Sequence, residues 1–279
     1  ESNLQRQMMF DERDARERTP KAAAAARRVA DINSEVVCEA VVADINASNV
    51  ERLVEGCDVV LDGTDNFATR FLVNDACVKR GVPWVYGAAV GSYGVTLTIV
   101  PRVTPCLRCV FPEVPAAGTA PTCDTAGVVM PIIAIVAAVQ VAEALKLLTG
   151  NVASLHGGLM QFDVWRNEWR RIGAGRRAPD CPACALGRFE ALEVEAGDMA
   201  TVLCGRDAVQ VSPRGAASLD LEALAARLRA AGEVKANEYL VRLRAGGYEL
   251  TVFRDARAIV RGTDDPAVAR SVYARYVGT

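Results

Sequence analysis

The segment DVVLDGTDN, residues 58–66, decides the fold, because it reads as an apolar strand that runs into a polar turn. A short helix is expected just before it, around residues 47–54. The β-branched run EVVCEAVVADI, residues 35–45, predicts another strand ahead of that helix. The order strand, helix, strand indicates a βαβ arrangement.

The chain after this segment continues the alternation. A helix is expected over Phe67–Arg80, closed by Gly81, and the strand VPWVYGAAV follows at residues 82–90. Repeated alternation of this kind is typical of an α/β fold, a doubly wound and mostly parallel sheet with helices on both faces. Ligands bind such sheets beyond the carboxyl ends of the strands, where the DGTDN turn places Asp65.

Beyond Gly91 the pattern changes to antiparallel strands and then to a second domain. A strand at residues 93–101, a polar loop to Thr125, a buried helix to Leu148 and a hairpin at residues 160–173 complete the first domain. From about Met199 the sequence pattern predicts short strands and two helices, as in a small α+β domain. We therefore expect one domain over residues 1–190 and another over residues 199–279.

Composition excludes several classes of protein. The 279 residues are 51% hydrophobic and 24% charged, which suits one large domain and one small domain. The net charge of -2 offers no field to attract nucleic acid. The longest apolar stretch, Ala126–Val139, is shorter than the about 20 residues of a membrane span, and no export signal is evident. A cytoplasmic protein without a membrane anchor is expected.

Two C-x-x-C pairs give the strongest local signal. They are CLRC and CPAC, with cysteines at Cys106, Cys109, Cys181 and Cys184. Four thiolates satisfy the tetrahedral demand of a structural zinc ion and leave no open coordination position. The alternative is two unrelated buried pairs or redox dithiols.

The other cysteines divide into two groups. Four lie in apolar surroundings and are expected to be small core residues: Cys38, Cys57, Cys77 and Cys204. Cys123 instead lies in a polar loop just before the long apolar helix, whose positive N-terminal end would favour a thiolate. From position alone, Cys123 is as well explained by an inert loop residue as by a nucleophile.

The single histidine, His156, limits the chemistry. No second histidine is present, so Cys-His, Ser-His-Asp and histidine-rich catalytic metal sites within one chain are not expected, and neither is acid-base catalysis by imidazole. Charge stabilisation by Arg, Lys and a carboxylate-held magnesium ion suits the inventory better. Nucleotidyl transfer is a reaction of that kind.

Several segments together resemble the ThiF/MoeB/HesA family, the bacterial relatives of ubiquitin-activating enzymes. They are SNLQRQ at residues 2–7, TPK at 19–21, LDGTDNFATR at 61–70, TCDTAGVVMP at 122–131 and the two C-x-x-C pairs. The resemblance covers about residues 1–185 and implies a Rossmann-like sheet. LCGRDAVQV and SVYARYVG, in the C-terminal part, resemble the extra domain of longer thiamine-pathway ThiF proteins, and no rhodanese-like domain is evident.

The resemblance implies an activity and its components. The family adenylates the C-terminal Gly-Gly carboxylate of a small ubiquitin-like sulfur-carrier protein with ATP and magnesium, here for thiamine thiazole synthesis. The residues that match the family's site are Ser2, Asn3, Leu4, Gln5, Arg6 and Lys21 around the triphosphate, Asp65 and Asn66 at the magnesium, and Cys123 as the thiol that takes the activated carboxylate. The four C-x-x-C cysteines match its zinc ligands, and a homodimer is implied.

One expectation from the resemblance concerns the N-terminus. Family members carry a strand, a Gly-rich turn, a helix and a second strand before the SNLQRQ segment, whereas this sequence opens on that segment. We therefore expect an N-terminally truncated sheet without the phosphate-cradling turn. Two other functions stay open: a MoeB-like adenylyltransferase of molybdopterin synthesis, and a catalytically silent scaffold that keeps carrier binding and dimerisation.

Overall fold

The computed structural model describes residues 3–113, 126–193, 199–203, 207–213 and 218–278. The chain divides into two compact units. The larger unit comprises Ser2–Gln7 and Ile45–Glu195, and the smaller unit comprises Glu1, Met8–Asp44 and Ala196–Thr279. The domain limits expected from the sequence, 1–190 and 199–279, stay a prediction.

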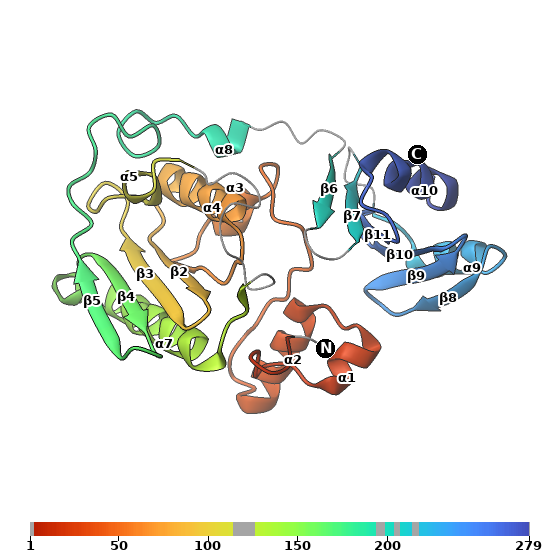
Figure 1. The fold of residues 1–279 in the computed structure, drawn as a ribbon, viewed down its shortest axis with the longest axis horizontal. Helices are drawn as coiled ribbons and strands as arrows, with labels where there is room; N and C mark the ends of the chain where they lie inside the picture. The colour runs from red at the N-terminus through yellow and green to blue at the C-terminus, as the bar shows by residue number, and fades with distance from the viewer. Residues whose placement is uncertain (1–2, 114–125, 194–198, 204–206, 214–217, 279) are drawn as a thin grey trace. The chain divides into compact units, whose positions relative to one another are not determined.

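The larger unit is built on a five-stranded mixed sheet (Figure 1). Its strands lie in chain order: β1 (Val60–Leu61), β2 (Trp84–Val90), β3 (Tyr93–Ile99), β4 (Leu159–Asp163) and β5 (Glu168–Ile172). β1 pairs with β2 in parallel, and the other neighbouring strands are antiparallel. The α/β class is confirmed, as is the change to antiparallel strands after Gly91.

Helices cover both faces of this sheet, as the alternation predicts. Trp84 and Tyr86 of β2 point to one face, where they form a core with Phe71 of helix α4 (Phe67–Arg80). Helix α7 (Met130–Leu148) packs on the opposite face of β2 and β3. The remaining helical segments of this unit are α3 (Val50–Val54), α5 (Leu107–Val110), α8 (Glu190–Glu193) and a 3₁₀ turn at Val152–Ser154.

The smaller unit joins two N-terminal helices to an antiparallel sheet. α1 (Glu12–Glu17) and α2 (Lys21–Ile32) come first. The sheet order is β6-β7-β11-β10-β9-β8, and α9 (Leu221–Leu228) and α10 (Pro266–Tyr276) close the core. Its strands are β6 (Met199–Leu203), β7 (Ala208–Ser212), β8 (Glu233–Ala236), β9 (Leu240–Ala245), β10 (Tyr248–Phe253) and β11 (Ala258–Arg261).

The strand predicted over residues 35–45 is wrong. These residues form neither helix nor strand, and Val37 is 97% exposed. A strand needs a neighbour that accepts its ladder of hydrogen bonds, and within the described residues β1 pairs with β2 alone. The core placement predicted for Cys38 and Cys57 is also wrong, because both are exposed. Cys77 is buried, as predicted. Cys204 lies outside the described residues.

α7 is long and apolar enough, by length and composition, to cross a membrane, and only 28% of its most apolar window is buried. Its inner face nevertheless carries Gln140 and Glu143, both buried against the sheet. Polar side chains with partners inside the protein are typical of a core helix of a globular domain, as the sequence predicts. The apolar residues on its outer face remain exposed.

Candidate active site

Asp65 lies in the turn between β1 and α4, at the carboxyl end of β1. Asn66 is the N-cap of α4, since its Oδ1 accepts a hydrogen bond of 2.8 Å from the Thr69 amide. Asp65 precedes the cap and is exposed, and Asn66 Nδ2 lies 3.5 Å from its Oδ1. An exposed carboxylate offers hard oxygen ligands of the kind that magnesium binds.

A buried ion pair fixes the turn that carries Asp65. Asp62 is 7% exposed and Arg70 is 6% exposed, and the two are joined by a 3.1 Å bond from Arg70 Nε to Asp62 Oδ2. Asp62 Oδ1 also accepts from the Thr64 amide at 2.8 Å. Neither residue was predicted as part of the site, although a carboxylate at the end of an apolar strand and an arginine eight residues later were a signal that could have pointed to the pair.

α7 supports the same turn from behind the sheet. Gln140 Nε2 donates to the carbonyl oxygens of Asp62 and Val85, at 2.9 Å each. This reach depends on Gly87, because a Cβ atom there would lie 2.6 Å from the Gln140 side chain. Gln140 was not predicted as part of the site, because its role depends on the packing of α7.

The N-terminal segment forms a compact turn in the larger unit. The amides of Arg6 and Gln7 donate to the Asn3 carbonyl, and Arg6 Nη2 donates to Asn3 Oδ1 at 2.6 Å. Leu4 and Gln5 lie within this turn, and Ser2 lies outside the described residues. The turn presents an arginine and amide groups of the kind that bind phosphate oxygens.

Of the remaining predicted site residues, the structure describes Lys21 but not Cys123. Lys21 is the first residue of α2 and is exposed, and it belongs to the smaller unit, whereas Asp65 belongs to the larger unit. Cys123 lies outside the described residues. The chain just after it is anchored, because the Gly91 amide donates to the Gly127 carbonyl at 2.8 Å and the Val129 amide donates to the Gly91 carbonyl at 2.9 Å.

The two C-x-x-C pairs meet in space. The sulfur atoms of the four cysteines all lie within 4.8 Å of one another, with Cys106 to Cys181 at 3.6 Å and Cys109 to Cys184 at 3.4 Å. Tetrahedral zinc with Zn–S bonds of about 2.3 Å requires sulfur separations of about 3.8 Å. The cluster therefore has the size and donor type that structural zinc requires.

The thiol pKa values show why this cluster needs a cation. Burial raises the pKa of Cys106, and it raises the pKa of Cys109 to about 11. Burial also opposes ionisation of Cys184, but hydrogen bonds from Arg177 and the neighbouring thiols lower its pKa. Two buried and two half-buried thiolates this close together would repel one another without a metal ion to neutralise them.

α4 connects the Cys cluster to the Asp65 turn. In the first pair, the Leu107 amide donates to Asn74 Oδ1 at 2.9 Å, and Arg108 makes two bonds of 2.9 Å to the Asp75 carboxylate. Asp75 also accepts from the Ala191 amide, after the second pair. One helix thus begins at the Asp65 turn and, about two turns later, carries Asn74 and Asp75, which anchor the first Cys pair.

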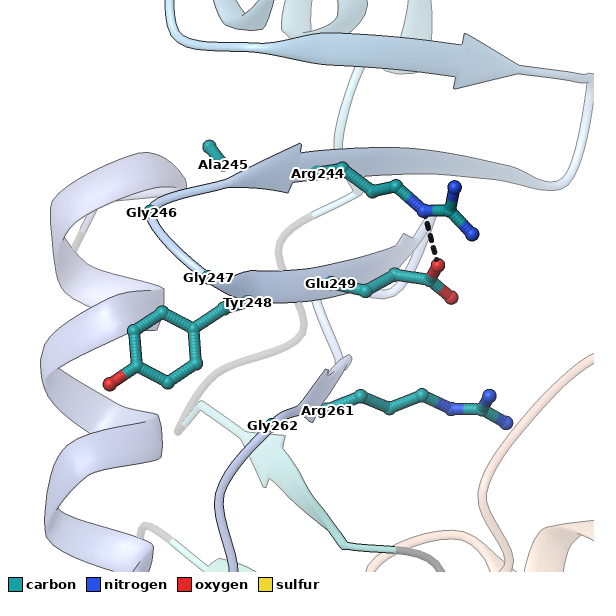
Figure 2. A pocket seen from close by; sticks show the side chains of 8 residues that line it. All are labelled: Arg244, Ala245, Gly246, Gly247, Tyr248, Glu249, Arg261 and Gly262. Carbon is teal, nitrogen blue, oxygen red and sulfur yellow. Dashed lines mark hydrogen bonds and ion pairs between the residues drawn. The ribbon is translucent and has the colours of Figure 1, made fainter.

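A groove on the smaller unit is separate from these residues. It has a volume of about 540 Å³ and lies at the β9–β10 turn (Figure 2). Arg244 and Arg261 flank Glu249 there, and Arg244 Nε bonds to Glu249 at 2.8 Å. None of the predicted site residues lines this groove.

The comparisons with known proteins agree with this geometry. The ThiF family model matches residues 1–183. The sulfur carrier protein ThiS adenylyltransferase of Bacillus subtilis (strain 168) is 46% identical, over 99% of this chain and 82% of that protein. The SAMP-activating enzyme E1 of Haloferax volcanii is 42% identical, over 69% of this chain and 70% of that protein.

The solved structures agree in fold. A crystal structure of E. coli MccB with ATP has a TM-score of 0.54 and 21% identity, and it covers 66% of this chain. The chain spans 56% of that MccB chain. Because identity is this low, the likeness concerns the fold alone. Together with the match over residues 1–183, these findings confirm the resemblance read from the sequence motifs. The chain belongs to the ThiF family.

Proposed function

We propose that this protein adenylates the C-terminal Gly-Gly carboxylate of a small ubiquitin-like sulfur-carrier protein, with ATP as the second substrate. The observation that carries the proposal is the exposed Asp65 carboxylate, fixed between the end of β1 and the N-terminus of α4 in a chain of the ThiF family. The name of the B. subtilis relative, which matches almost the whole chain, supports the same reaction.

The reaction transfers an AMP group to a carboxylate. A carboxylate oxygen of the carrier attacks the α-phosphorus of ATP, the bond to the bridging oxygen breaks, and pyrophosphate leaves. Little proton transfer is needed, which suits a chain with one histidine. Asp65 would hold magnesium, which neutralises phosphate charge when bound. Arg6 and Lys21 would stabilise the charge that moves to the leaving pyrophosphate.

Cys123 and the Cys cluster have separate proposed roles. Cys123 would take the carrier's activated carboxylate as a thiolate nucleophile, with AMP as the leaving group. The Cys cluster would bind zinc in a closed site and stabilise the fold. The cysteines found free among the described residues suit a reducing compartment, which supports a cytoplasmic location.

The carrier of thiamine thiazole synthesis is favoured over that of molybdopterin synthesis. The B. subtilis relative matches 99% of the chain, including the smaller unit's sheet, whereas the H. volcanii relative matches 69%. This near-complete match supports a ThiF-type protein rather than a MoeB-type one.

We also propose a homodimer formed through the outer face of α7. Val141, Leu145 and Leu148 on that face are each 49–56% exposed. An apolar helix face of this size is unfavourable in water and is typical of a subunit interface.

Carrier-dependent exchange of labelled pyrophosphate into ATP tests the proposed reaction. Exchange should require magnesium and a carrier that ends in Gly-Gly, and it should disappear with a carrier that lacks the last glycine. A chain that binds the carrier but supports no exchange would instead favour the silent scaffold.

A further inference from the structure

Arg70 joins three parts of the larger unit through one guanidinium group. Its Nε donates to Asp62 Oδ2 at 3.1 Å, at the end of β1. Its Nη2 donates to the Thr64 carbonyl at 2.6 Å and to the Gly87 carbonyl of β2 at 3.2 Å. Thr64 precedes Asp65 in the chain, so the guanidinium bonds to the backbone beside that carboxylate.

Asp62 closes the turn from the other side. Its Oδ1 accepts from the Thr64 amide at 2.8 Å and from the Thr64 hydroxyl at 2.7 Å. Its Oδ2 accepts from the Gly87 amide at 3.3 Å in addition to Arg70. The turn before Asp65 is therefore held by both members of the pair.

The surroundings keep the pair in one arrangement. The Arg70 guanidinium lies 5.7 Å from the centre of the Phe67 ring and 5.4 Å from that of Tyr86. Both members of the pair are buried. Buried arginine between two aromatic rings has few alternative rotamers, and breaking its partner leaves an uncompensated charge.

We propose that Asp62 and Arg70 are positioning residues, which hold Asp65 at the edge of the sheet where it meets magnesium and ATP. The role of Asp65 in binding magnesium rests on the proposed function. The positioning itself rests on the contacts of the turn. Asp62 and Arg70 touch no reacting atom, and they act through the backbone of residues 62–65.

The test compares Asp62→Asn with Glu143→Gln. Glu143 is also a buried carboxylate of the larger unit, and it accepts from Thr98 at 2.8 Å and from the His156 amide at 3.1 Å. Its hydrogen-bond partners Thr98, Lys146 and His156 lie outside residues 62–70. Both substitutions remove a buried charge and should lower the unfolding temperature. They differ in the contacts that they weaken: Asp62→Asn affects the turn before Asp65, whereas Glu143→Gln affects the contacts of α7 with Thr98 and His156.

Two readouts separate positioning from stability. Without ATP, the amides of residues 64–66 should exchange with deuterium about tenfold faster in Asp62→Asn than in wild type, and Glu143→Gln should leave them unchanged. In pyrophosphate exchange, Asp62→Asn should raise the magnesium concentration for half-maximal rate and lower kcat by about tenfold to a hundredfold. Glu143→Gln should change neither quantity.

Arg70→Lys provides a second variant if Asp62→Asn does not fold. A lysine ammonium keeps the charge but cannot bond to Asp62, Thr64 and Gly87 in the fixed geometry of a guanidinium, so the same two readouts should move. Unchanged turn exchange in both variants would overturn the proposal, as would an equal change in Glu143→Gln. If wild type lacks carrier-dependent exchange, the proposed function fails, and the deuterium comparison still decides whether the pair positions the turn.

Discussion

At the scale of single residues, Asp65 has a different role from Asp62 and Arg70. Asp65 is exposed and can meet a substrate, whereas Asp62 and Arg70 are buried and hold the turn. Motif reading predicts the exposed residue, since a carboxylate after a strand is a local signal. It does not predict Gln140, because that side chain reaches the turn only when α7 packs on Gly87.

Asp65→Ala should depress carrier-dependent pyrophosphate exchange by about a hundredfold or more, the scale of losing one electrostatic stabiliser. Fold stability should change little, because Asp65 is exposed. Initial exchange rates at saturating ATP measure the effect. Asp58→Ala, at an exposed position before β1, is the matched control and should exchange at the wild-type rate.

Cys123→Ala should separate the second step from the first. Exchange should be nearly intact, because the thiolate acts only after the acyl-adenylate exists. No covalent adduct between carrier and enzyme should form, as judged by non-reducing electrophoresis and mass spectrometry. Loss of exchange in Cys123→Ala with exchange retained in Asp65→Ala would contradict the roles given to the two residues.

At the scale of elements, those marked by local sequence features were predicted correctly, whereas those that depend on a distant pairing partner were not. α4 begins and ends at Phe67 and Arg80 as predicted, because the Asn66 cap and the left-handed Gly81 that ends it are local features. The strand over residues 35–45 was wrong because β-branched composition does not supply a pairing partner. β8 was not predicted, since four residues with two charges give no clear alternation.

The Cys cluster should bind one zinc ion per chain. Metal analysis of protein purified without chelator should find it, and Cys106→Ser should lose it, whereas Cys57→Ser at an exposed position should not. Removal of zinc should lower the unfolding temperature by roughly 5 °C or more, since domains of this size shift by about 2–4 °C per kcal/mol. Metal-free protein with four freely titratable thiols would rule the zinc site out.

His156, which packs against Glu143 of α7, should make the stability of the fold depend on pH. Burial holds the pKa of His156 below its ordinary value of 6.5, although Glu143 opposes the shift. Below pH 6.5 the unfolded chain takes up a proton that the folded chain does not, so stability should fall as pH falls from 6.5 towards the folded pKa. Unfolding midpoints from pH 7.5 to 5 should show this loss in wild type and a smaller loss in His156→Gln.

At the scale of the whole molecule, the outer face of α7 should bring two chains together. Leu145→Glu places a charge on the exposed apolar face and should convert a dimer into a monomer in sedimentation velocity at micromolar concentration. Val103→Glu, at another exposed apolar position, should leave the dimer intact. A wild-type chain that sediments only as a monomer would contradict this interface.

The most direct measurement of the central claim is the intact mass of the carrier after incubation with this protein, ATP and magnesium. We predict that the carrier gains one AMP group, that pyrophosphate appears with it, and that Asp65→Ala prevents both. A carrier of unchanged mass, with ATP converted to ADP and phosphate, would contradict the account, because attack at the α-phosphorus releases pyrophosphate and not phosphate.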